Sequence, residues 1–595
     1  MCGILGIVDK EGGSAREAVL QPMLDAIHHR GPDGQGTYEE GPVAMGMRRL
    51  SIIDIDGGRQ PFFSRGGRVI AFQNGEIYNF KALRRELEER GYTFTSTCDT
   101  EVLAHGYDAW GIRGLLNRLD GMFALAILDR DESALYIARD RFGEKPLYYA
   151  HSGNRFAYSS TLATVVAHGW VNGDIDTLSL HRYLSLHYVP GDRTIFLGVS
   201  KLLPGQALRL GIDSMRLDTF LYYIPFLAAE PHAPSEKRLS ELLDESIVTR
   251  LAADVPVGVF LSGGVDSSLV AAMSARHHSG INTFSIGFDS AGHDESQYAK
   301  AVAKHIGSRH HHFIFDQDRF NDLLPQVAAY LDEPLGDQAC LPTYWLCQEA
   351  RKVVTVALSG EAADEVFGGY SYYDVPAASR PGSLLGEPGN ATSISGFPLL
   401  LDVTQSKALA DHRGGSEDEW EAGLAGWLNT AADPVMKSMA ADLTTWLPDN
   451  LLVKLDRMCM AHSLEGRAPY LNREIVEYGL NLRPSGKISE NVFKVTLRKV
   501  AEPLLPKGIF DRPKQGFVLP MEKWLASWFE EYGSPKYYFA QAGIPHLDTK
   551  SLGIFCEDQQ RMGMPNQRAV FSAIMLCEWY TAFSRKTAQL RDAVA

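Results

Sequence analysis

Cys2, close to the start of the chain, carries two groups that could cooperate in catalysis. Once Met1 is removed, this residue has both a thiol and a free α-amine, and the amine can act as general base for the thiol. Gly3 follows and has no side chain to obstruct a substrate. Position alone favours a buried, inert cysteine, so the prediction of a nucleophile depends on other residues.

Three other segments offer the groups that would hold an amino acid beside such a thiol. Arg49 begins a strand-like run and presents a guanidinium suited to a carboxylate. Asn74-Gly75 places a side-chain amide beside a glycine N–H, the pair of donors that an oxyanion hole needs. Asp99 could pair with a substrate ammonium. Singly, these residues could be a surface arginine, a hairpin turn and a helix cap; together with Cys2 they predict an amino-acid site.

Five motifs in chain order make the first part of the sequence resemble the class II glutamine amidotransferases. They are Cys2-Gly3-Ile4, His29-Arg30-Gly31-Pro32-Asp33, Arg49-Leu50-Ser51-Ile52, Asn74-Gly75-Glu76-Ile77-Tyr78-Asn79 and Arg139-Asp140-Arg141-Phe142-Gly143. The resemblance implies an N-terminal-nucleophile fold in which Cys2 attacks the side-chain amide of glutamine and releases ammonia. It also implies that Asn74 and Gly75 hold the oxyanion. The implied glutamine-binding residues are Arg49, Leu50, Ile52, Asn74, Gly75, Glu76 and Asp99.

A glycine-rich segment further along the chain is predicted to bind phosphate. It reads Leu261-Ser262-Gly263-Gly264-Val265-Asp266-Ser267-Ser268 and lies between a predicted strand and a predicted helix. Its glycines would expose backbone N–H groups at a helix N-terminus, which favours an anion, and Asp266 could hold Mg²⁺. The segment fits neither the GxxxxGK[ST] loop nor the GxGxxG fingerprint, so the usual NTPase and dinucleotide folds are disfavoured.

A second segment also leaves the carboxyl end of a predicted strand, at Leu358-Ser359-Gly360-Glu361-Ala362-Ala363-Asp364. Ligands of doubly wound sheets bind at this edge, so Asp266 and Asp364 are predicted to share one Mg²⁺. Glu361 would then be free for proton transfer.

This half of the sequence resembles the synthetase domain of the glutamine-hydrolysing asparagine synthetases. The phosphate loop resembles that of enzymes that cleave ATP to AMP and pyrophosphate, with ATP and Mg²⁺ as the implied co-substrate and metal. The implied ATP-binding residues are Leu261, Ser262, Gly263, Gly264, Asp266, Ser267, Ile286, Ser359 and Gly360. Lys514, within Arg512-Pro513-Lys514-Gln515-Gly516-Phe517, matches the catalytic lysine of that family, although a solvated surface lysine is the alternative. A further block, Lys454-Leu455-Asp456-Arg457-Met458 to Asn472, is also similar to the family, with mild departures at Tyr470 and Asn472.

Together the two resemblances imply a glutamine-dependent amide ligase in which ammonia passes inside the protein to an acyl adenylate. L-Aspartate is the expected acceptor and L-asparagine the product. The alternative is amidation of a different carboxylate in natural-product or surface-polysaccharide synthesis, because the segment 331–340 resembles the branch of the family that includes such enzymes. Within it, Glu333, Asp337 and Gln338 are expected to supply residues of the acceptor pocket. The intact motifs argue against a β-lactam synthetase-like ring closer and against a non-catalytic binding protein.

The elements needed to position these groups can be predicted from hydrophobic patterning. Short apolar runs separated by turn signals fill the first part of the chain to about Lys201, which predicts a layered β-rich domain with a few helices such as Phe80–Arg90. Proline-rich residues 203–234 are predicted to be a linker. Strands then alternate with helices from Glu236 to Leu358, which predicts a doubly wound parallel sheet, and the rest is mainly helical.

The predicted fold class is therefore α/β, with an N-terminal-nucleophile αββα domain at 2–210 and an ATP-pyrophosphatase domain at 235–595. Residues 376–415 are rich in Gly, Ser and Pro and are predicted to be a variable insertion.

The composition of the chain excludes some classes of binding partner and indicates its location. The net charge of −15 over 595 residues argues against binding to nucleic acid or anionic membranes, and no apolar run approaches the ~18 residues of a membrane span. The start of the chain lacks the positive region of a signal peptide, and seven unpatterned cysteines suit a reducing compartment, so a cytoplasmic location is expected. The expected partners are glutamine, ATP and the carboxylate acceptor, with a homodimer as the candidate assembly. His310-His311-His312 is expected not to bind metal, because alternate residues of a strand face opposite sides.

Overall fold

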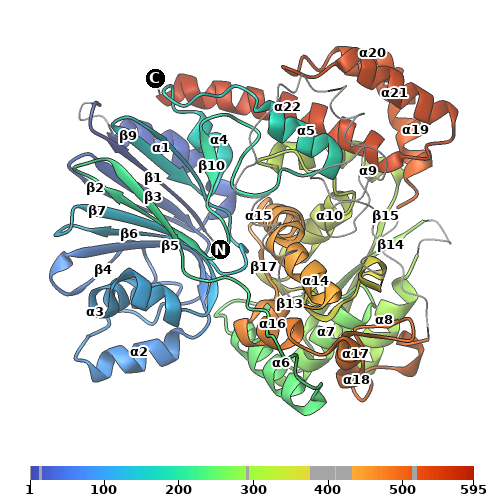
Figure 1. Ribbon diagram of the computed structural model, residues 1–595, viewed down its shortest axis with the longest axis horizontal. Helices are drawn as coiled ribbons and strands as arrows, with labels where there is room; N and C mark the ends of the chain where they lie inside the picture. Colours follow the sequence, from blue (N-terminus) through green and yellow to red (C-terminus); the bar gives the residue numbers. More distant parts are fainter. Residues whose placement is uncertain are drawn as a thin grey trace.

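The computed structural model describes residues 2–12, 16–289, 294–374, 409, 432–511 and 519–594. It shows two halves side by side (Figure 1). The first half contains two six-stranded sheets, and the second contains a five-stranded parallel sheet surrounded by helices. The predicted α/β class and both of its architectures are confirmed.

The first antiparallel sheet has the strand order β10-β8-β9-β1-β3-β2. Its strands are β1 Gly3–Asp9, β2 Gly34–Glu40, β3 Val43–Arg49, β8 Tyr148–Ser152, β9 Arg155–Ser159 and β10 Val199–Lys201. Strand β1 is central and pairs with β3 in a register that places Gly3 opposite Arg48. Cys2 therefore enters the sheet beside the end of β3, where Arg49 lies.

The second antiparallel sheet has the order β12-β11-β7-β6-β5-β4. Its strands are β4 Phe62–Phe63, β5 Val69–Ile77, β6 Gly121–Asp129, β7 Ala134–Arg139, β11 Gln206–Gly211 and β12 Arg216–Leu221. Buried residues from both sheets, including Ile4, Met45, Phe72 and Ala124, form one core between them. Helix α1 (Arg16–Ala26) contacts the first sheet and α3 (Glu101–Arg118) the second, with α2 (Phe80–Glu89) beside α3. These contacts build the predicted αββα layers.

The predicted linker is wrong in its first part. Strands β11 and β12 lie within residues 203–234, so the second sheet continues to Leu221 despite the prolines. Pro204-Gly205 precedes β11, and the prolines at 225, 231 and 234 follow β12. Two shorter helices, α4 (Leu162–Val166) and α5 (Thr177–Leu186), complete the described helices of the first half.

The parallel sheet of the second half has the order β15-β14-β13-β16-β17. Its strands are β13 Val257–Phe260, β14 Asn282–Phe288, β15 Arg309–Phe315, β16 Val356–Leu358 and β17 Glu465–Arg467. The sequence predicted the first four strands within a few residues, but not β17, which is short and contains two charged residues. From β13 the chain builds the sheet first towards β14 and β15 and then, on the other side, towards β16 and β17. The loops after β13 and β16 therefore face one another, and ligands of such sheets bind between loops at this position.

Helices cover this sheet and form the rest of the second half. They are α6 Glu236–Leu251, α7 Val265–His277, α8 Ser296–Ile306, α9 Gln317–Tyr330, α10 Cys340–Arg351, α11 Ala363–Phe367, α14 Pro434–Thr444, α15 Leu452–Met460, α16 Arg473–Leu480, α17 Pro484–Lys487, α18 Val495–Ala501, α19 Met521–Tyr532, α20 Pro535–Ala540, α21 Thr549–Arg561 and α22 Gln567–Val594. A small hairpin pairs β18 (Ile488–Ser489) with β19 (Val492–Phe493). The predicted insertion at 376–415 lies outside the described residues apart from Leu409.

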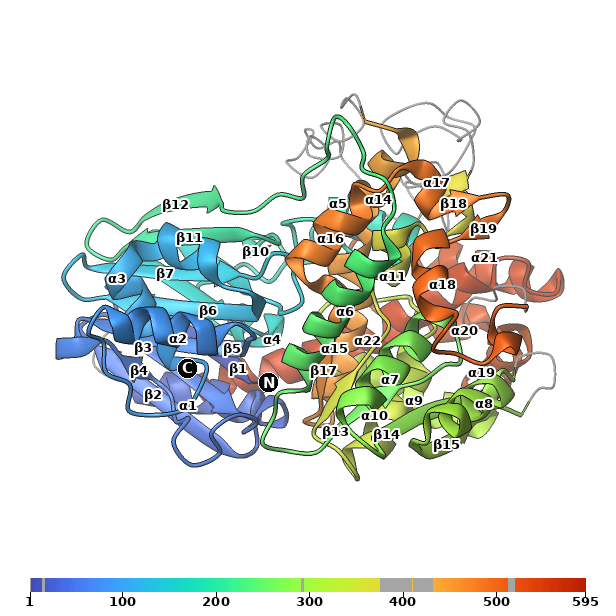
Figure 2. The same ribbon diagram turned by 90° about the horizontal axis from the view of Figure 1, so that it is seen from below.

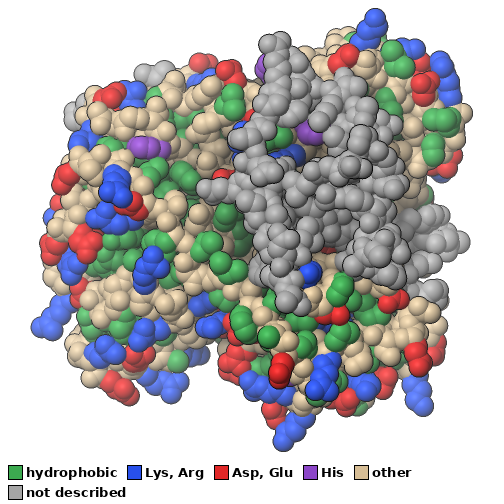
Figure 3. All heavy atoms as spheres, viewed as in Figure 1, with side chains coloured by type: hydrophobic (Ala, Val, Ile, Leu, Met, Phe, Trp, Pro, Cys, Tyr) green, Lys and Arg blue, Asp and Glu red, His purple; other side chains and the backbone are tan. Residues whose placement is uncertain are grey.

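Helix α22 joins the two halves, a role that the sequence did not indicate. It packs against α9 and α19 of the second half and against α1, α4 and α5 of the first (Figures 1 and 2). Its Arg591 donates to the carbonyl of Val166 at 3.1 Å, and Tyr183 Oη donates to the carbonyl of Ser572 at 2.8 Å. No helix among the described residues is long and apolar enough to cross a membrane, and acidic and basic side chains are mixed over the face seen in Figure 3.

Trp579 should be the strongest single packing contribution of α22 to this junction. The indole is fully buried and its ring lies 5.9 Å from that of Phe196, in the first half. We expect Trp579→Ala to destabilise the junction by about 3–5 kcal/mol, as for other buried Trp or Phe truncations. The measurement is thermal and denaturant unfolding, with Arg585→Ala, which is exposed on the same helix, as the control. Equal stability of the two variants would contradict the assigned packing.

Candidate functional site

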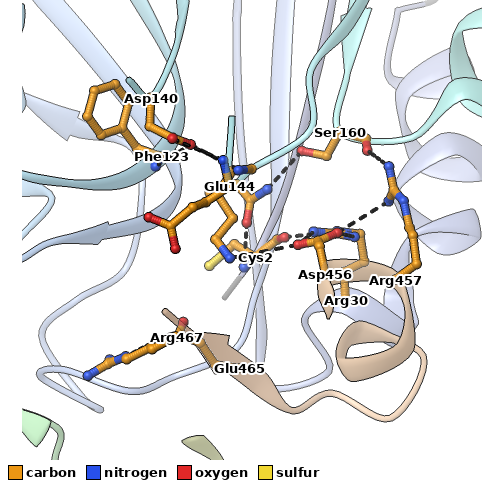
Figure 4. Close-up of polar contacts among 12 residues, drawn as sticks. Cys2, Arg30, Phe123, Asp140, Glu144, Ser160, Asp456, Arg457, Glu465 and Arg467 are labelled. Atoms are coloured by element: carbon orange, nitrogen blue, oxygen red, sulfur yellow. Dashed lines mark hydrogen bonds and ion pairs between the residues drawn. The ribbon is translucent and has the colours of Figure 1, made fainter. Parts of the chain in front are cut away.

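Cys2 lies buried at the boundary between the halves, and both of its backbone groups are held (Figure 4). Its N–H donates to Asn74 Oδ1 at 3.0 Å, and its carbonyl accepts from Arg30 Nε at 3.1 Å. Burial raises the pKa of the Cys2 thiol. A thiol in this environment needs a nearby base to become a nucleophile, and the α-amine of the same residue is the nearest candidate.

Asn74 and Gly75 lie inside β5, not in a hairpin turn. Asn74 Nδ2 donates to Ser160 Oγ at 3.3 Å, and Ser160 Oγ also accepts from the N–H of Ile4 at 3.1 Å. Gly75 has φ +143°, and a Cβ at this position would lie 1.9 Å from the carbonyl oxygen of Met122 on β6. The close approach of β5 and β6 therefore requires glycine beside the Asn74 amide.

Arg49 organises the loop that follows it. Its guanidinium donates to the carbonyls of Ile53 at 3.1 Å, Asp54 at 2.6 Å and Ile55 at 2.8 Å. Asp54 in turn accepts from the N–H of Thr97 at 2.6 Å, which ties this loop to the segment carrying Asp99. Leu50 and Ile52 are buried in the same turn of chain.

Asp99 does not cap helix α3. Its carboxylate accepts from the N–H of Ile77 at 2.8 Å and from Gln73 Nε2 at 3.0 Å, so it faces strand β5. Burial raises the pKa of Asp99. A carboxylate held this way, next to the Asn74-Gly75 pair, is suited to a cationic substrate group, as expected from the sequence.

The second half of the chain reaches the same pocket, which sequence reasoning missed. Arg467 on β17 is fully buried and lies 3.5 Å from Glu76 and 2.6 Å from Glu465. Burial, with the nearby charge of Asp99, raises the pKa of Glu76. Figure 4 shows Glu465 and Arg467 on the side of Cys2 that faces the second half. The block containing these residues was found by resemblance, but no spacing rule connects it to Cys2.

The phosphate loop adopts a tight turn between β13 and α7. The N–H of Ser262 donates to Ser267 Oγ at 3.1 Å, and the N–H of Gly264 donates to Ser262 Oγ at 3.3 Å. Gly263 has φ +79°, and a Cβ there would lie 2.6 Å from the backbone nitrogen of Ala299. The turn thus leaves the start of α7 open to an anion while α8 packs behind it.

The segment after β16 lies against this loop, as predicted. A Cβ on Gly360 would lie 2.9 Å from the backbone nitrogen of Ser267. Leu261 and Ser359 are buried at the ends of β13 and β16, and Ile286 lies on the adjacent strand β14. The residues expected to contact ATP are therefore brought to one edge of the sheet.

Asp266 and Asp364 share a cation, but it is a lysine. The ammonium of Lys494 lies 2.6 Å from Asp266 and 2.9 Å from Asp364. Despite burial, the two carboxylates raise the pKa of Lys494 further above its ordinary value. Lys494 has a left-handed backbone and was not predicted, because a single lysine after a turn carries no signal in sequence.

The two carboxylates also fit Mg²⁺. Among the described residues no group of three or more His, Cys, Asp or Glu side chains converges on a metal position. Two carboxylates are nevertheless a common protein contribution to Mg²⁺, which takes its other ligands from phosphates and water. Mg²⁺ at Asp266 and Asp364 would therefore take its remaining ligands from phosphate and water, and the ammonium of Lys494 would have to leave its position between the two carboxylates.

Glu361 faces a second buried lysine. Lys454 on α15 lies 3.3 Å from Glu361 and 3.6 Å from Asp337, and these carboxylates raise the pKa of Lys454. Asp337, in the segment expected to supply the acceptor pocket, therefore contacts the same lysine as Glu361. The next residue, Gln338, is half-buried. Lys514 lies outside the described residues.

Glu333, one of the three residues from which the acceptor pocket was expected to draw, contacts the first half. Its carboxylate lies 3.2 Å from Lys201 Nζ and accepts from the N–H of Ile195 at 2.8 Å, both in the first half. Glu333 is therefore a contact between the halves. Of the three histidines on β15, His310 and His312 share Ser285 Oγ while His311 contacts Asn282, the alternation expected for a strand.

Comparisons with known proteins match both halves. Residues 1–222 match the glutamine amidotransferase domain, and residues 238–581 match the asparagine synthase family. A relative from Mycobacterium tuberculosis is 34% identical over 98% of this chain and 97% of its own length. The asparagine synthetases [glutamine-hydrolyzing] 1 and 3 of Bacillus subtilis are each 32% identical, over 98% and 87% of this chain and 96% and 87% of their own.

These matches and the two-half fold define a class of protein: carbon–nitrogen ligases with an attached glutaminase. The chain belongs to the family of glutamine-hydrolysing asparagine synthases.

Gly75→Ala should disable the glutamine half without affecting the other. The added methyl would collide with the carbonyl of Met122 and separate β5 from β6 beside Asn74. We expect glutamine hydrolysis to fall by about 100-fold, because displacement of about 1 Å near reacting groups has effects of that size. Steady-state glutaminase assays check this, with Gly169→Ala as the control, because no atom lies within 4 Å of a Cβ added there and its backbone is not left-handed. Unchanged hydrolysis by Gly75→Ala would contradict the assigned geometry.

Proposed function

We propose that this enzyme makes L-asparagine from L-aspartate, using ammonia released from glutamine at Cys2. The observation that carries the proposal is the pair of complete, separate constellations joined at one boundary. Cys2, Asn74, Arg49 and Asp99 gather in the first half, and Asp266, Asp364 and Glu361 gather in the second. The family membership supports both partial reactions. The proposed location is the cytoplasm, where glutamine and ATP are abundant.

The glutamine reaction follows from the contacts of Cys2. After loss of Met1, the α-amine takes the thiol proton and the sulfur attacks the side-chain carbonyl carbon of glutamine. Asn74 Nδ2 and the N–H of Gly75 stabilise the oxyanion that develops. Arg49 and Asp99 hold the α-carboxylate and α-amine, with Glu76 beside them. The amine returns its proton to the departing nitrogen, ammonia leaves, and water hydrolyses the thioester to glutamate.

The second reaction needs the ATP edge of the parallel sheet. The phosphates would lie at the start of α7, where they would replace the contacts that the N–H of Gly264 and the hydroxyls of Ser262 and Ser267 make within the loop. Mg²⁺ held by Asp266 and Asp364 would neutralise charge on the pyrophosphate that leaves. The acceptor carboxylate attacks the α-phosphorus, giving an acyl adenylate and pyrophosphate. Lys494 is positioned to offset the negative charge that accumulates in this step, and the family resemblance assigns Lys514 the same role.

Ammonia then displaces AMP from the acyl adenylate. Glu361, 3.3 Å from Lys454, is the proposed acceptor of the proton that the attacking nitrogen must lose. A second pair of charges, Asp337 and Lys454, supports aspartate as the substrate. Asp337 can hold its ammonium and Lys454 its second carboxylate. The other candidate is amidation of a different carboxylate, favoured only by the composition of residues 331–340.

Cys2→Ala should abolish synthesis with glutamine but preserve synthesis with ammonium salt. No other residue offers a thiol beside a free α-amine, whereas the second site needs only neutral ammonia, which is more abundant at moderately high pH. The measurement is asparagine formation by the same variant with each nitrogen source. Full activity with glutamine, or none with ammonium from a folded protein, would refute the two-site proposal.

Pyrophosphate release should depend on aspartate and on the carboxylate pair. We expect Asp364→Asn and Lys494→Met each to lower it by about 100-fold, since each loses a charge aimed at the reacting phosphates, while glutamine hydrolysis stays within about twofold of the unmodified enzyme. A panel of carboxylic acids tests the acceptor: faster release with another acid than with aspartate would favour the second candidate. The matched control is Asp289→Asn, an exposed carboxylate that follows β14 on the same sheet.

A further inference from the structure

Arg30 connects the nucleophile to the other half of the protein. Its Nε donates to the carbonyl of Cys2 at 3.1 Å. Its two terminal nitrogens donate to the two oxygens of Asp456 on α15, at 2.8 and 3.1 Å. Arg30 is fully buried and Asp456 nearly so, so neither charge can use water as a substitute partner. Figure 4 shows the continuous chain from Cys2 through Arg30 to Asp456.

This series of contacts depends on the rigid, planar shape of the Arg30 guanidinium. The two-point contact with Asp456 determines the plane of the fork, and the plane determines where Nε points. Burial opposes ionisation of Asp456, but the charges of Arg30, Arg457 and Lys145 outweigh it and hold its pKa well below the usual range. The carboxylate is therefore present as the counter-charge throughout the neutral pH range.

Cys2 depends on such external restraints more than an ordinary residue does. Regular strand pairing begins only at Gly3, and after loss of Met1 no peptide precedes Cys2. The N–H contact to Asn74 comes from the first half, but the amine must also serve as the base. The contact from Arg30 to the Cys2 carbonyl restrains the residue without occupying the thiol or the amine, the two groups that react.

We propose that Asp456 is a positioning residue for glutamine hydrolysis, supplied by the synthetase half. It orients Arg30, and Arg30 fixes the carbonyl of Cys2 and thereby the direction of the Cys2 thiol. The proposal rests on the proposed role of Cys2 as nucleophile. It makes the first reaction depend on correct docking of α15, an element of the second half.

Helix α15 is suited to this dependence because it contacts both sites. Arg457 Nη2 donates to the carbonyl of Ser160 at 3.0 Å, and Ser160 Oγ is the partner of Asn74 Nδ2. Lys454, two residues before Asp456 on the same helix, contacts Glu361. A shift of α15 away from the synthetase site would therefore also move the anchors of Cys2 and Asn74.

The test is Asp456→Asn in the full-length, Met1-processed enzyme. The amide keeps the shape but loses the charge and one acceptor oxygen. We expect kcat for glutamine hydrolysis to fall about 10- to 100-fold, with KM for glutamine within about threefold because Arg49 and Asp99 are untouched. Ammonia-dependent synthesis should stay within about twofold, since Lys454 and Glu361 remain.

Glu333→Gln is the matched control. It also removes a buried carboxylate that crosses the boundary, but its partners, Lys201 and the N–H of Ile195, do not lead to Cys2. We expect its glutaminase kcat to remain within about twofold of the unmodified enzyme. Equal losses in Asp456→Asn and Glu333→Gln, or equal losses of both activities in Asp456→Asn, would assign Asp456 a structural role and overturn the proposal.

Arg30→Lys provides a second route if Asp456→Asn does not fold. Lysine keeps the charge opposite Asp456 but cannot hold both oxygens and the Cys2 carbonyl, so a similar loss of kcat is expected. Normal kcat in Arg30→Lys would overturn the proposal while Cys2→Ala still tests the nucleophile. If Cys2→Ala itself hydrolyses glutamine normally, the proposed function fails first.

Discussion

The boundary between the two halves is held by ion pairs that water does not reach, and the rest of the structure depends on their being matched. Arg30 meets Asp456, Lys201 meets Glu333 and Arg467 meets Glu76 across the boundary. Removing one partner of such a pair leaves an uncompensated buried charge, which costs about 3–5 kcal/mol. Apolar surfaces would tolerate small slides, whereas these charges have partners in only one arrangement. The pairs therefore fix the register of one half on the other.

That register is what a two-site enzyme needs. In the proposed reaction, ammonia would have to reach the second site without being protonated in bulk water, so the surroundings of Cys2 would have to be covered by the synthetase half. The short strand β17 and helix α15 provide this closure with side chains that belong to neither sheet's hydrophobic core. Helix α22 adds apolar packing on another face, where Trp579 meets Phe196.

The local parts of this arrangement could be predicted from sequence. Strand β13, the glycine turn and helix α7 follow one another directly, so apolar runs and turn residues locate them. The same holds for the strands of the first half, and for Asn74-Gly75 within a motif. Contacts made by residues outside the recognised site motifs, or between the two halves, could not be predicted. Arg30 and Asp456 are 426 residues apart, and a single lysine such as Lys494 gives no pattern that points to Asp266 and Asp364.

The predictions that failed have physical causes of the same kind. Prolines at 203–234 suggested a linker, but they flank the β11–β12 hairpin, which the second sheet holds in place. Glu333 was one of three residues, with Asp337 and Gln338, from which the acceptor pocket was expected to draw. Its charge is instead taken up by Lys201, a residue whose position only the folded chain defines.

The separation of Arg30 from Asp456 also has a consequence for the order of synthesis. On the ribosome, residues are added at about 5–20 per second, so about 20–90 s pass between Arg30 and Asp456. During that time the first half can fold, but Arg30 has no counter-charge and the carbonyl of Cys2 has no fixed partner. If Asp456 orients Arg30 as proposed, the nascent chain would release ammonia efficiently only after most of the synthetase half has been made.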